Sequence, residues 1–261
     1  MQSITYYVLK LLNIVNPRVD MSKYNKAVSF KLINKKHVNS KPSTPQVIIH
    51  PEMISIASGT MPDKTDKQSR FIGQAVAAFE MGKYAVTVSQ WQAVMGRLPH
   101  GNDELSSEQP VMNVNWYDVQ NFITKLNKLT GKAYRLPTEL EWEYAARGGS
   151  TQDYYFHHND LHHINRDRDK VNYDKNRNGT VVVGSFPPNP WGLHEMLGNI
   201  WEWVDYTKTE GFNPNAIYDE SCHILRGGCW ASGSFEIRLT AQTKHGNGEC
   251  GWDSFGFRLA R

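Results

Sequence analysis

Apolar and polar positions follow a helical spacing in three segments of the chain. The first segment is predicted to be a helix that starts after Thr87 and stops at Gly96, because Thr87 and Gln90 form a capping box and glycine readily ends a helix. The second starts after Asn115, gathers its apolar residues on one face and stops at Gly131. Both segments therefore carry their own start and stop signals.

The third helical segment is capped by Thr138, has Glu141 three residues later and runs into Gly148. After residue 150 the helical spacing disappears. Short apolar runs between glycines and prolines replace it, at Thr180–Phe186, Ile224–Trp230 and Phe255–Leu259. Helices first and short strands later predict an α+β domain with a high loop content.

The first 48 residues differ from the rest of the chain. Apart from one short apolar run, Tyr6–Val15, they show weak periodicity, and they end in a polar stretch typical of a linker. They hold eight Lys or Arg against one acid, a net charge of +7; since the whole chain carries +3, the remainder carries −4. We expect a basic leader and linker over residues 1–48, solvated rather than bound to an anionic surface, and one domain over residues 49–261.

Composition argues against several classes of function. A net charge of +3 is too small to predict binding of nucleic acid. The run Tyr6–Val15 is interrupted by Lys10 and is too short to cross a bilayer, and no small-residue cleavage site follows it, as a signal peptide would require. Cys222, Cys229 and Cys250 match no disulfide or zinc pattern, which predicts reduced thiols and a cytoplasmic protein.

Several phrases occur in a fixed order along the chain, and together they resemble the formylglycine-generating-enzyme family, also called the sulfatase-modifying-factor family. They lie at Phe79–Thr87, Gln109–Val111, Asn115–Asp118, Tyr134–Gly149, Gly184–Asn189, Gly192–Trp203, Arg226–Gly228 and Gly256–Arg261. So many ordered phrases are specific for a fold. They are less specific for a function, because this fold serves several.

The resemblance implies a C-type-lectin-like fold with a small twisted antiparallel sheet, about three helices and long ordered loops. Proteins of this kind include copper-dependent cysteine oxidases, iron-dependent sulfur–carbon synthases and a pyoverdine-maturation factor. They also include non-catalytic binders, among them the variable proteins of diversity-generating retroelements. The resemblance therefore implies either an enzyme or a binding protein, and the residues of the site must decide between them.

In the cysteine oxidases of this family, two thiols shortly after the Gly-Gly pair bind copper. Counting from Gly227 and Gly228, the resemblance places Ser232 and Glu236 at those positions. A hydroxyl and a carboxylate do not replace two thiolates as copper ligands. We therefore expect no copper and no formylglycine-generating activity, and we interpret Cys229 as a small buried residue.

The resemblance also implies structural calcium, which binds hard oxygen ligands. One predicted site uses the carboxylates of Glu195 and Glu202 and the carbonyls of Gly198 and Ile200; relatives commonly have asparagine in place of Glu195. Another predicted site starts at Asn172. For this second site, a polar turn without metal is an equal alternative.

Two further polar stretches offer metal ligands. The run Asp174–Gly179 is only superficially similar to an EF-hand loop, since Ser185 stands where that loop requires glutamate and no flanking helices are predicted. The stretch His157–His163 contains four histidines that could bind a transition metal. We interpret it instead as a solvated insertion loop.

The segment from Trp230 to Phe255 lies between strict motifs but is itself chemically mixed. It resembles the C-terminal variable region of retroelement-diversified proteins, and its Ser, Gly, Trp and polar residues suit an adaptable recognition surface. We expect Trp230 to be core and Trp252 to be the strongest contact. The predicted ligand contacts are Ser232, Ser234, Glu236, Thr240, Gln242, His245, Asn247, Glu249, Trp252 and Asp253.

These observations favour a non-catalytic ligand-binding protein of C-type-lectin-like fold, with a protein or another macromolecule bound at the C-terminal face. The alternative is a metal-dependent oxidoreductase of the same superfamily that is not a true formylglycine-generating enzyme. A scaffold acting through the basic leader ranks third. The sequence identifies neither the ligand nor the oligomeric state.

Overall fold

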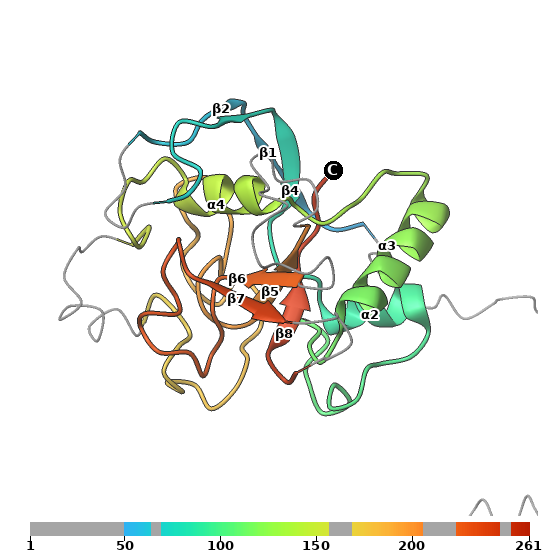
Figure 1. The fold of residues 1–261 in the computed structure, drawn as a ribbon. Coiled ribbons are helices and arrows are strands. Elements are labelled where there is room, and N and C mark those ends of the chain that lie inside the picture. Colours follow the sequence, from blue (N-terminus) through green and yellow to red (C-terminus); the bar gives the residue numbers. More distant parts are fainter. Residues whose placement is uncertain (1–49, 64–68, 157–168, 206–222, 246–251) are drawn as a thin grey trace, which may run out of the picture. The chain divides into compact units, whose positions relative to one another are not determined.

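The structure, a computed structural model, describes residues 50–63, 69–156, 169–205, 223–245 and 252–261. All of them fall within the unit Pro45–Arg261. They form three helices and several small sheets joined by long loops (Figure 1), so the predicted α+β fold class is confirmed. The predicted boundary at residue 48 and the stretch His157–His163 lie outside the described residues.

The three predicted helices form where their capping signals are. They are α2 (Val88–Met95), α3 (Trp116–Thr130) and α4 (Glu139–Arg147). Each N-cap side chain accepts a hydrogen bond from the third residue of its helix in a complete capping box, and a left-handed glycine ends each helix. One detail differs from the prediction. Leu129 is 59% exposed, because the buried face of α3 extends only as far as Leu126.

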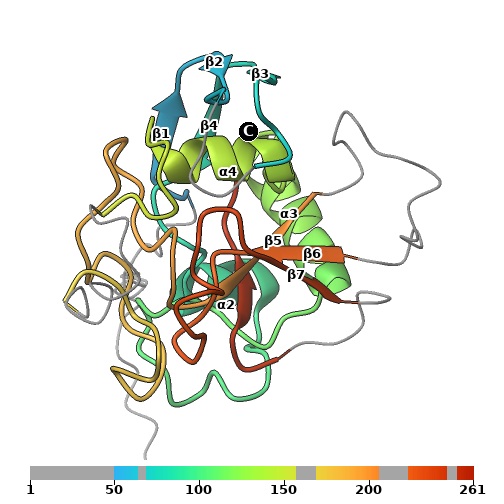
Figure 2. The same cartoon turned by 60° about the vertical axis from the view of Figure 1, so that its left-hand side comes forward.

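The main sheet has four strands in the order β7-β6-β5-β8, and Figure 2 shows β5, β6 and β7 side by side. They are β5 (Trp201–Val204), β6 (His223–Arg226), β7 (Gln242–His245) and β8 (Phe255–Phe257). β6 pairs antiparallel with both of its neighbours, whereas β5 and β8 are parallel. The sheet is therefore mixed and not purely antiparallel, since the chain crosses from the β7 edge to the opposite edge before it forms β8.

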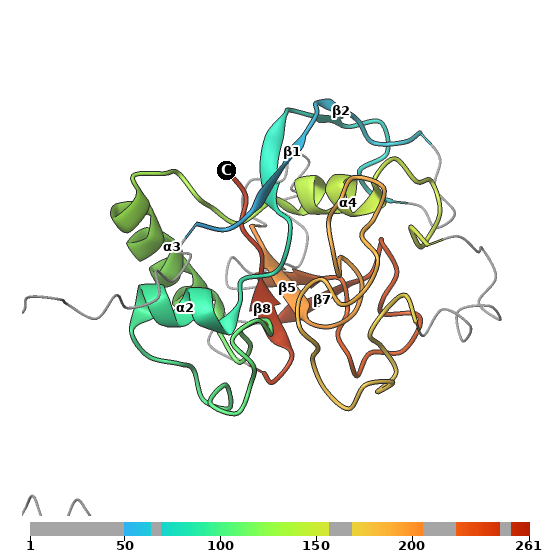
Figure 3. The same ribbon diagram turned by 180° about the vertical axis from the view of Figure 1, so that it is seen from behind.

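Two shorter ladders complete the strands. β1 (Met53–Ile56) pairs antiparallel with β4 (Phe79–Gly82), and β2 (Gly59–Thr60) pairs with β3 (Ala75–Val76). The last residues extend this pairing, because Glu80 and Arg261 exchange backbone hydrogen bonds of 2.9 and 3.0 Å. Figure 3 shows the C-terminus beside β1 and β4, so segments from both ends of the domain lie together.

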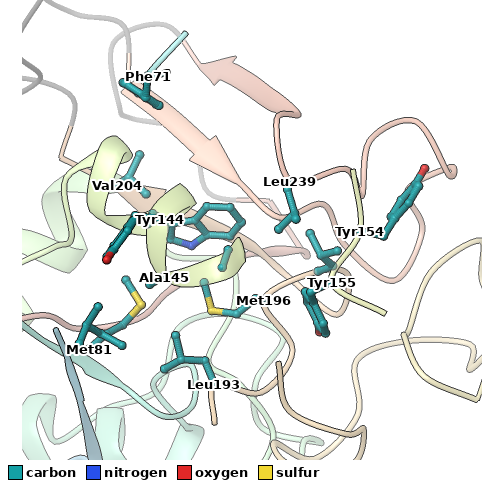
Figure 4. Packing of buried hydrophobic residues seen from close by; sticks show 14 of the residues in the cluster. Phe71, Met81, Tyr144, Ala145, Tyr154, Tyr155, Leu193, Met196, Val204 and Leu239 are labelled. Atoms are coloured by element: carbon teal, nitrogen blue, oxygen red, sulfur yellow. The ribbon is translucent and has the colours of Figure 1, made fainter. Parts of the chain in front are cut away.

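Buried apolar side chains form two clusters. The first contains Trp142 of α4 together with Met81, Leu193 and Met196, and Figure 4 shows several of these side chains facing one another. The second joins α2 and α3 to the main sheet. In it, the Trp91 and Phe122 rings stack at 5.2 Å and Phe122 meets Phe257 edge-on at 5.3 Å. No helix in the described ranges is long and apolar enough to span a bilayer.

Residues 180–186, an apolar run expected to resemble a strand, form turns instead. Three of their N–H groups bond to buried side chains, and the Val183 N–H bonds to the Glu108 carbonyl, which belongs to a loop and not to a strand. The two carboxylate oxygens of Glu195 accept the N–H groups of Gly184 and Phe186 at 2.9 and 3.0 Å, and Asn199 accepts another amide at 2.9 Å. This loop is therefore fixed by side chains that the apolar pattern does not reveal.

Candidate functional site

The predicted ligand contacts separate into groups according to their exposure. Trp252 is 57% exposed. Glu236, Gln242 and Asp253 are also exposed, and Ser234 and Thr240 are half-buried. Asn247 and Glu249 lie outside the described residues, and His245 is described only as the last residue of β7. Trp230, predicted to be core, is half-buried against the second cluster.

Ser232 is buried, which contradicts its predicted role as a surface contact. It is 4% exposed, and its Oγ accepts the Cys229 N–H at 3.1 Å. Cys229 is itself buried in the second cluster, as predicted. Glu236, in contrast, is exposed, and its carboxylate accepts the Gly233 N–H at 2.8 Å. The two positions that the resemblance assigns to copper thiols therefore have different surroundings, one buried and one in contact with water.

A tight turn over residues 233–236 exposes an aromatic residue that the sequence analysis did not select. The Glu236 N–H donates to the Gly233 carbonyl at 3.0 Å and closes the turn. Phe235 lies at its tip with 63% exposure, and the Arg238 guanidinium lies 4.2 Å from its ring centroid. Ile237 is fully buried, and alternation along a strand would place Phe235, two positions earlier, on the same inner side. Phe235 is exposed because it belongs to a turn and not to a strand.

Residues from other parts of the chain hold the backbone of the segment from Trp230 to Phe255. The Tyr154 hydroxyl donates to the Ser234 carbonyl at 2.9 Å, and the Leu239 N–H donates to the Asp153 carbonyl at 2.9 Å. The Lys175 N–H donates to the Trp230 carbonyl at 2.8 Å. These three bonds use main-chain atoms of the segment, so they do not depend on which side chains it exposes.

Arg226 provides the strongest of these attachments. Its guanidinium is buried between α4 and the segment, and it donates to the carbonyls of Leu239 at 2.7 Å and Thr240 at 3.2 Å. On its other side it pairs with Glu143 at 2.7 Å and Glu139 at 3.3 Å. A buried ionic group on α4 therefore fixes the C-terminal segment through one arginine.

Asn172 offers one oxygen suited to a cation. The residue is fully buried, and its Nδ2 donates to the Gly179 carbonyl at 2.9 Å and to Asn199 Oδ1 at 3.1 Å. Its Oδ1 accepts no hydrogen bond from any described residue. A buried amide oxygen without a donor is costly unless something else binds it. Asn172 therefore fits a hard cation such as calcium.

Three of the other predicted calcium ligands, Glu195, Gly198 and Glu202, already accept hydrogen bonds. Arg258 donates to both oxygens of Glu202 at 2.8 Å, and Trp142 Nε1 donates to one of them at 2.7 Å. Burial raises the pKa of the Glu195 carboxyl, although the two loop amides bonded to it oppose this shift. The Gly198 carbonyl accepts the Ile200 N–H at 2.9 Å. Calcium at Glu202 would have to compete with Arg258, so this ligand set stays a prediction.

The small mixed sheet, the flanking helices and the long ordered loops define a C-type-lectin-like fold. Among proteins of this fold, the sequence identifies one family. Residues 38–261 match the sulfatase-modifying factor enzyme 1-like domain, and the chain belongs to this family.

Solved structures share the fold over most of the chain. Treponema denticola variable protein 1 is 26% identical with a TM-score of 0.66, over 80% of this chain and 94% of that one. PvdO from Pseudomonas aeruginosa is 25% identical with a TM-score of 0.64, over 82% of this chain and 95% of that one.

Curated relatives are similar over a shorter stretch. The mouse formylglycine-generating enzyme is 31% identical over 65% of this chain and 50% of its own length. A bovine protein named inactive C-alpha-formylglycine-generating enzyme 2 is 32% identical over 59% and 50%. The chain thus spans about half the length of these relatives. Because one name denotes an enzyme and the other an inactive protein, sequence identity does not decide activity.

Proposed function

We propose that this protein is a non-catalytic ligand-binding protein and that the exposed side chains between Trp230 and Phe255 form its recognition face. The observation that carries the proposal is that the backbone of this segment is held in place while several of its side chains are exposed. Tyr154, Asp153 and Arg226 hold its backbone from outside the segment, while several of its own side chains are exposed at the surface. Such a segment tolerates changes of surface chemistry without loss of structure.

The exposed residues also have the composition of a protein-binding surface. Phe235 and Trp252 are 63% and 57% exposed, and large aromatic side chains in such positions are frequent hot spots. Polar residues accompany them, among them Ser234, Gln242 and Asp253. The likeness to a variable protein of Treponema denticola supports the same view. We therefore propose a protein or another macromolecule as the ligand.

The first test concerns stability. In a face variant carrying Ser234→Ala, Gln242→Ala, Trp252→Ala and Asp253→Ala, we expect the free energy of unfolding to fall by no more than about 2 kcal/mol. Three of the positions are exposed and Ser234 is half-buried, and a surface substitution usually changes the free energy by about 0.5 kcal/mol. Ile237→Ala is the matched control from the same segment. Because Ile237 is fully buried, its truncation should cost about 2–5 kcal/mol. Urea unfolding measures both values.

The second test concerns binding and uses random peptides displayed on phage, selected on the wild-type protein. Enriched peptides should bind the face variant at least about 100-fold more weakly, because several contacts including a tryptophan are removed together. The proposal fails if the enriched peptides bind both proteins equally, if no peptide is enriched, or if the face variant is unfolded.

We further propose that a structural calcium ion binds at Asn172. A ligand that binds only the native state stabilises it by about 2.7 kcal/mol at a hundredfold excess over Kd, so a chelator should lower the melting temperature of the wild type. Asn172→Ala should abolish this calcium-dependent difference. Asn189→Ala is the matched control, since Asn189 is also a buried, hydrogen-bonded asparagine and its loss should leave the difference intact. Identical wild-type melting curves with calcium and with chelator would contradict the proposal.

A further inference from the structure

A cleft of about 560 Å³ opens on the domain where four segments meet. Residues 50–52, the stretch from Tyr84 into the first turn of α2, Glu108 and residues 182–183 line it. None of these residues belongs to the proposed recognition face.

Backbone hydrogen bonds join the walls of this cleft to one another. The Lys83 N–H donates to the Glu52 carbonyl at 2.8 Å, and the Ser89 N–H donates to the Ser107 carbonyl at 2.9 Å. The Val183 N–H donates to the carbonyl of Glu108 at 3.0 Å. All four segments are therefore held in place without a ligand, as in a preformed binding site.

Much of the lining is apolar or aromatic. Ala85, Val182 and Val183 contribute to it, and Val182 is 41% exposed. The Tyr84 ring is fixed from the side of the neighbouring loop, since a side chain at Gly184 would come within 3.1 Å of it and the His194 ring lies 5.0 Å away. An aliphatic chain could lie along this surface.

The charges at the cleft are not balanced. Glu52 pairs with Lys83 at 2.9 Å, whereas Glu108 has only hydroxyl partners, with Oε1 3.4 Å from Ser89 Oγ and 3.3 Å from Ser107 Oγ. Within the described ranges, Glu108 forms no ion pair. One carboxylate oxygen, Oε2, is therefore left for a ligand, and it carries uncompensated negative charge.

The adjacent end of α2 does not favour an anion. The Gln90 N–H donates to Thr87 Oγ1 at 3.3 Å, and the N–H groups of Val88 and Ser89 donate to carbonyls at 2.9 Å each. The first amides of the helix are thus already satisfied. Lys83 pairs with Glu52 and lies 5.2 Å from the Tyr84 ring centroid, so among the described residues Glu108 leaves the cleft with an unpaired negative charge, which favours a cation over an anion.

We propose that this cleft binds a primary ammonium group on an aliphatic stem, such as a lysine side chain. The ammonium group binds Glu108 Oε2 and the stem lies against Tyr84, Val182 and Val183. A guanidinium group fits less well, because its planar fork uses two carboxylate oxygens, whereas one oxygen of Glu108 already faces two hydroxyls. This site is separate from the proposed recognition face, so either proposal can fail while the other stands.

The test uses two small probes that differ only in the terminal ammonium group. Nα-acetyl-lysine N-methylamide is titrated into the full chain and followed by NMR, and the norleucine analogue supplies the same stem without the ammonium group. We expect the lysine probe to bind at least about tenfold more tightly and to lose affinity as salt is raised. Signals from Tyr84 and Val182 should shift on binding.

Variants of two glutamates on one loop complete the test. Glu108→Gln keeps the size of the side chain and the backbone bond to Val183 but removes the charge, so it should reduce binding of the lysine probe to the level of the norleucine probe. Glu104→Gln is the matched control, because Glu104 is exposed on the same loop and does not line the cleft. Equal binding of the two probes, absence of saturable binding, or an unchanged affinity in Glu108→Gln would each overturn the proposal.

Discussion

Arg258→Met is expected to lower the free energy of unfolding by about 3–5 kcal/mol, because it leaves the buried carboxylate of Glu202 without its ionic partner. Arg258 is fully buried and bonds both oxygens of Glu202. It also donates to the carbonyls of Gly82 at 3.0 Å and His194 at 2.8 Å. One side chain thus joins β4, β5 and the loop before β5, and methionine replaces none of these bonds.

Arg135→Met is the matched control for this expectation. Arg135 also pairs with a carboxylate through two bonds, to Glu141 at 2.6 and 2.7 Å, but its side chain is 32% exposed. Its loss should cost only about 0–1 kcal/mol. Urea unfolding of both variants gives the comparison. If Arg258→Met costs no more than Arg135→Met, the buried pair does not have the central role assigned to it.

Arg226→Met is also expected to lower the free energy of unfolding, by about 2–4 kcal/mol, but for a different reason. Glu139 and Glu143 keep other partners, Arg70 and Arg147, so no carboxylate is left without an ionic partner. The loss of stability comes instead from the carbonyls of Leu239 and Thr240, which lose the hydrogen-bond donor Arg226. A buried carbonyl without a hydrogen-bond donor costs about 1–3 kcal/mol.

Hydrogen exchange distinguishes this effect from general destabilisation. The amide of Leu239, bonded to Asp153, should exchange faster in Arg226→Met, because the segment has lost its attachment to α4. Arg226→Lys should behave similarly, since a single ammonium group does not reproduce the fork that contacts two carbonyls and two carboxylates. Unchanged exchange at Leu239 would show that Arg226 does not hold the segment.

Local signals made the helices predictable from the sequence. A capping box and a terminal glycine lie within a few residues of each other, so Thr87 and Gly96 define α2 without knowledge of the rest of the fold. The partners of the strands are distant in sequence, and β5 could be recognised only as part of a motif. The burial of the charged residues of α4 could not be predicted from the local sequence either. Glu139 and Glu143 have the spacing of a solvent-exposed helix face, and only the fold shows that both pair with the distant Arg226.

In the candidate site, too, local features could be predicted from the sequence and features that depend on distant contacts could not. The contrast between strict motifs and a mixed segment correctly located a stretch with several exposed side chains. It could not separate Ser232 from Ser234, since burial of the first depends on how the turn over residues 233–236 leads the chain back into the core. Phe235 was missed for the converse reason, because a phenylalanine next to buried positions is expected inside unless a turn carries it outward.

The pairing of the last residues with β4 has a consequence for how the protein is made. Glu80 and Arg261, which pair through both backbone and side chains, are 181 positions apart, and the carbonyl of Phe257 accepts the Val86 N–H at 2.9 Å. While the chain grows on the ribosome, Trp91 and Phe122 have no Phe257 to pack against. Contacts of such long separation make folding slow, and the nascent chain exposes apolar surface in the meantime. The second cluster therefore closes only after Phe257 and Leu259 have left the ribosome.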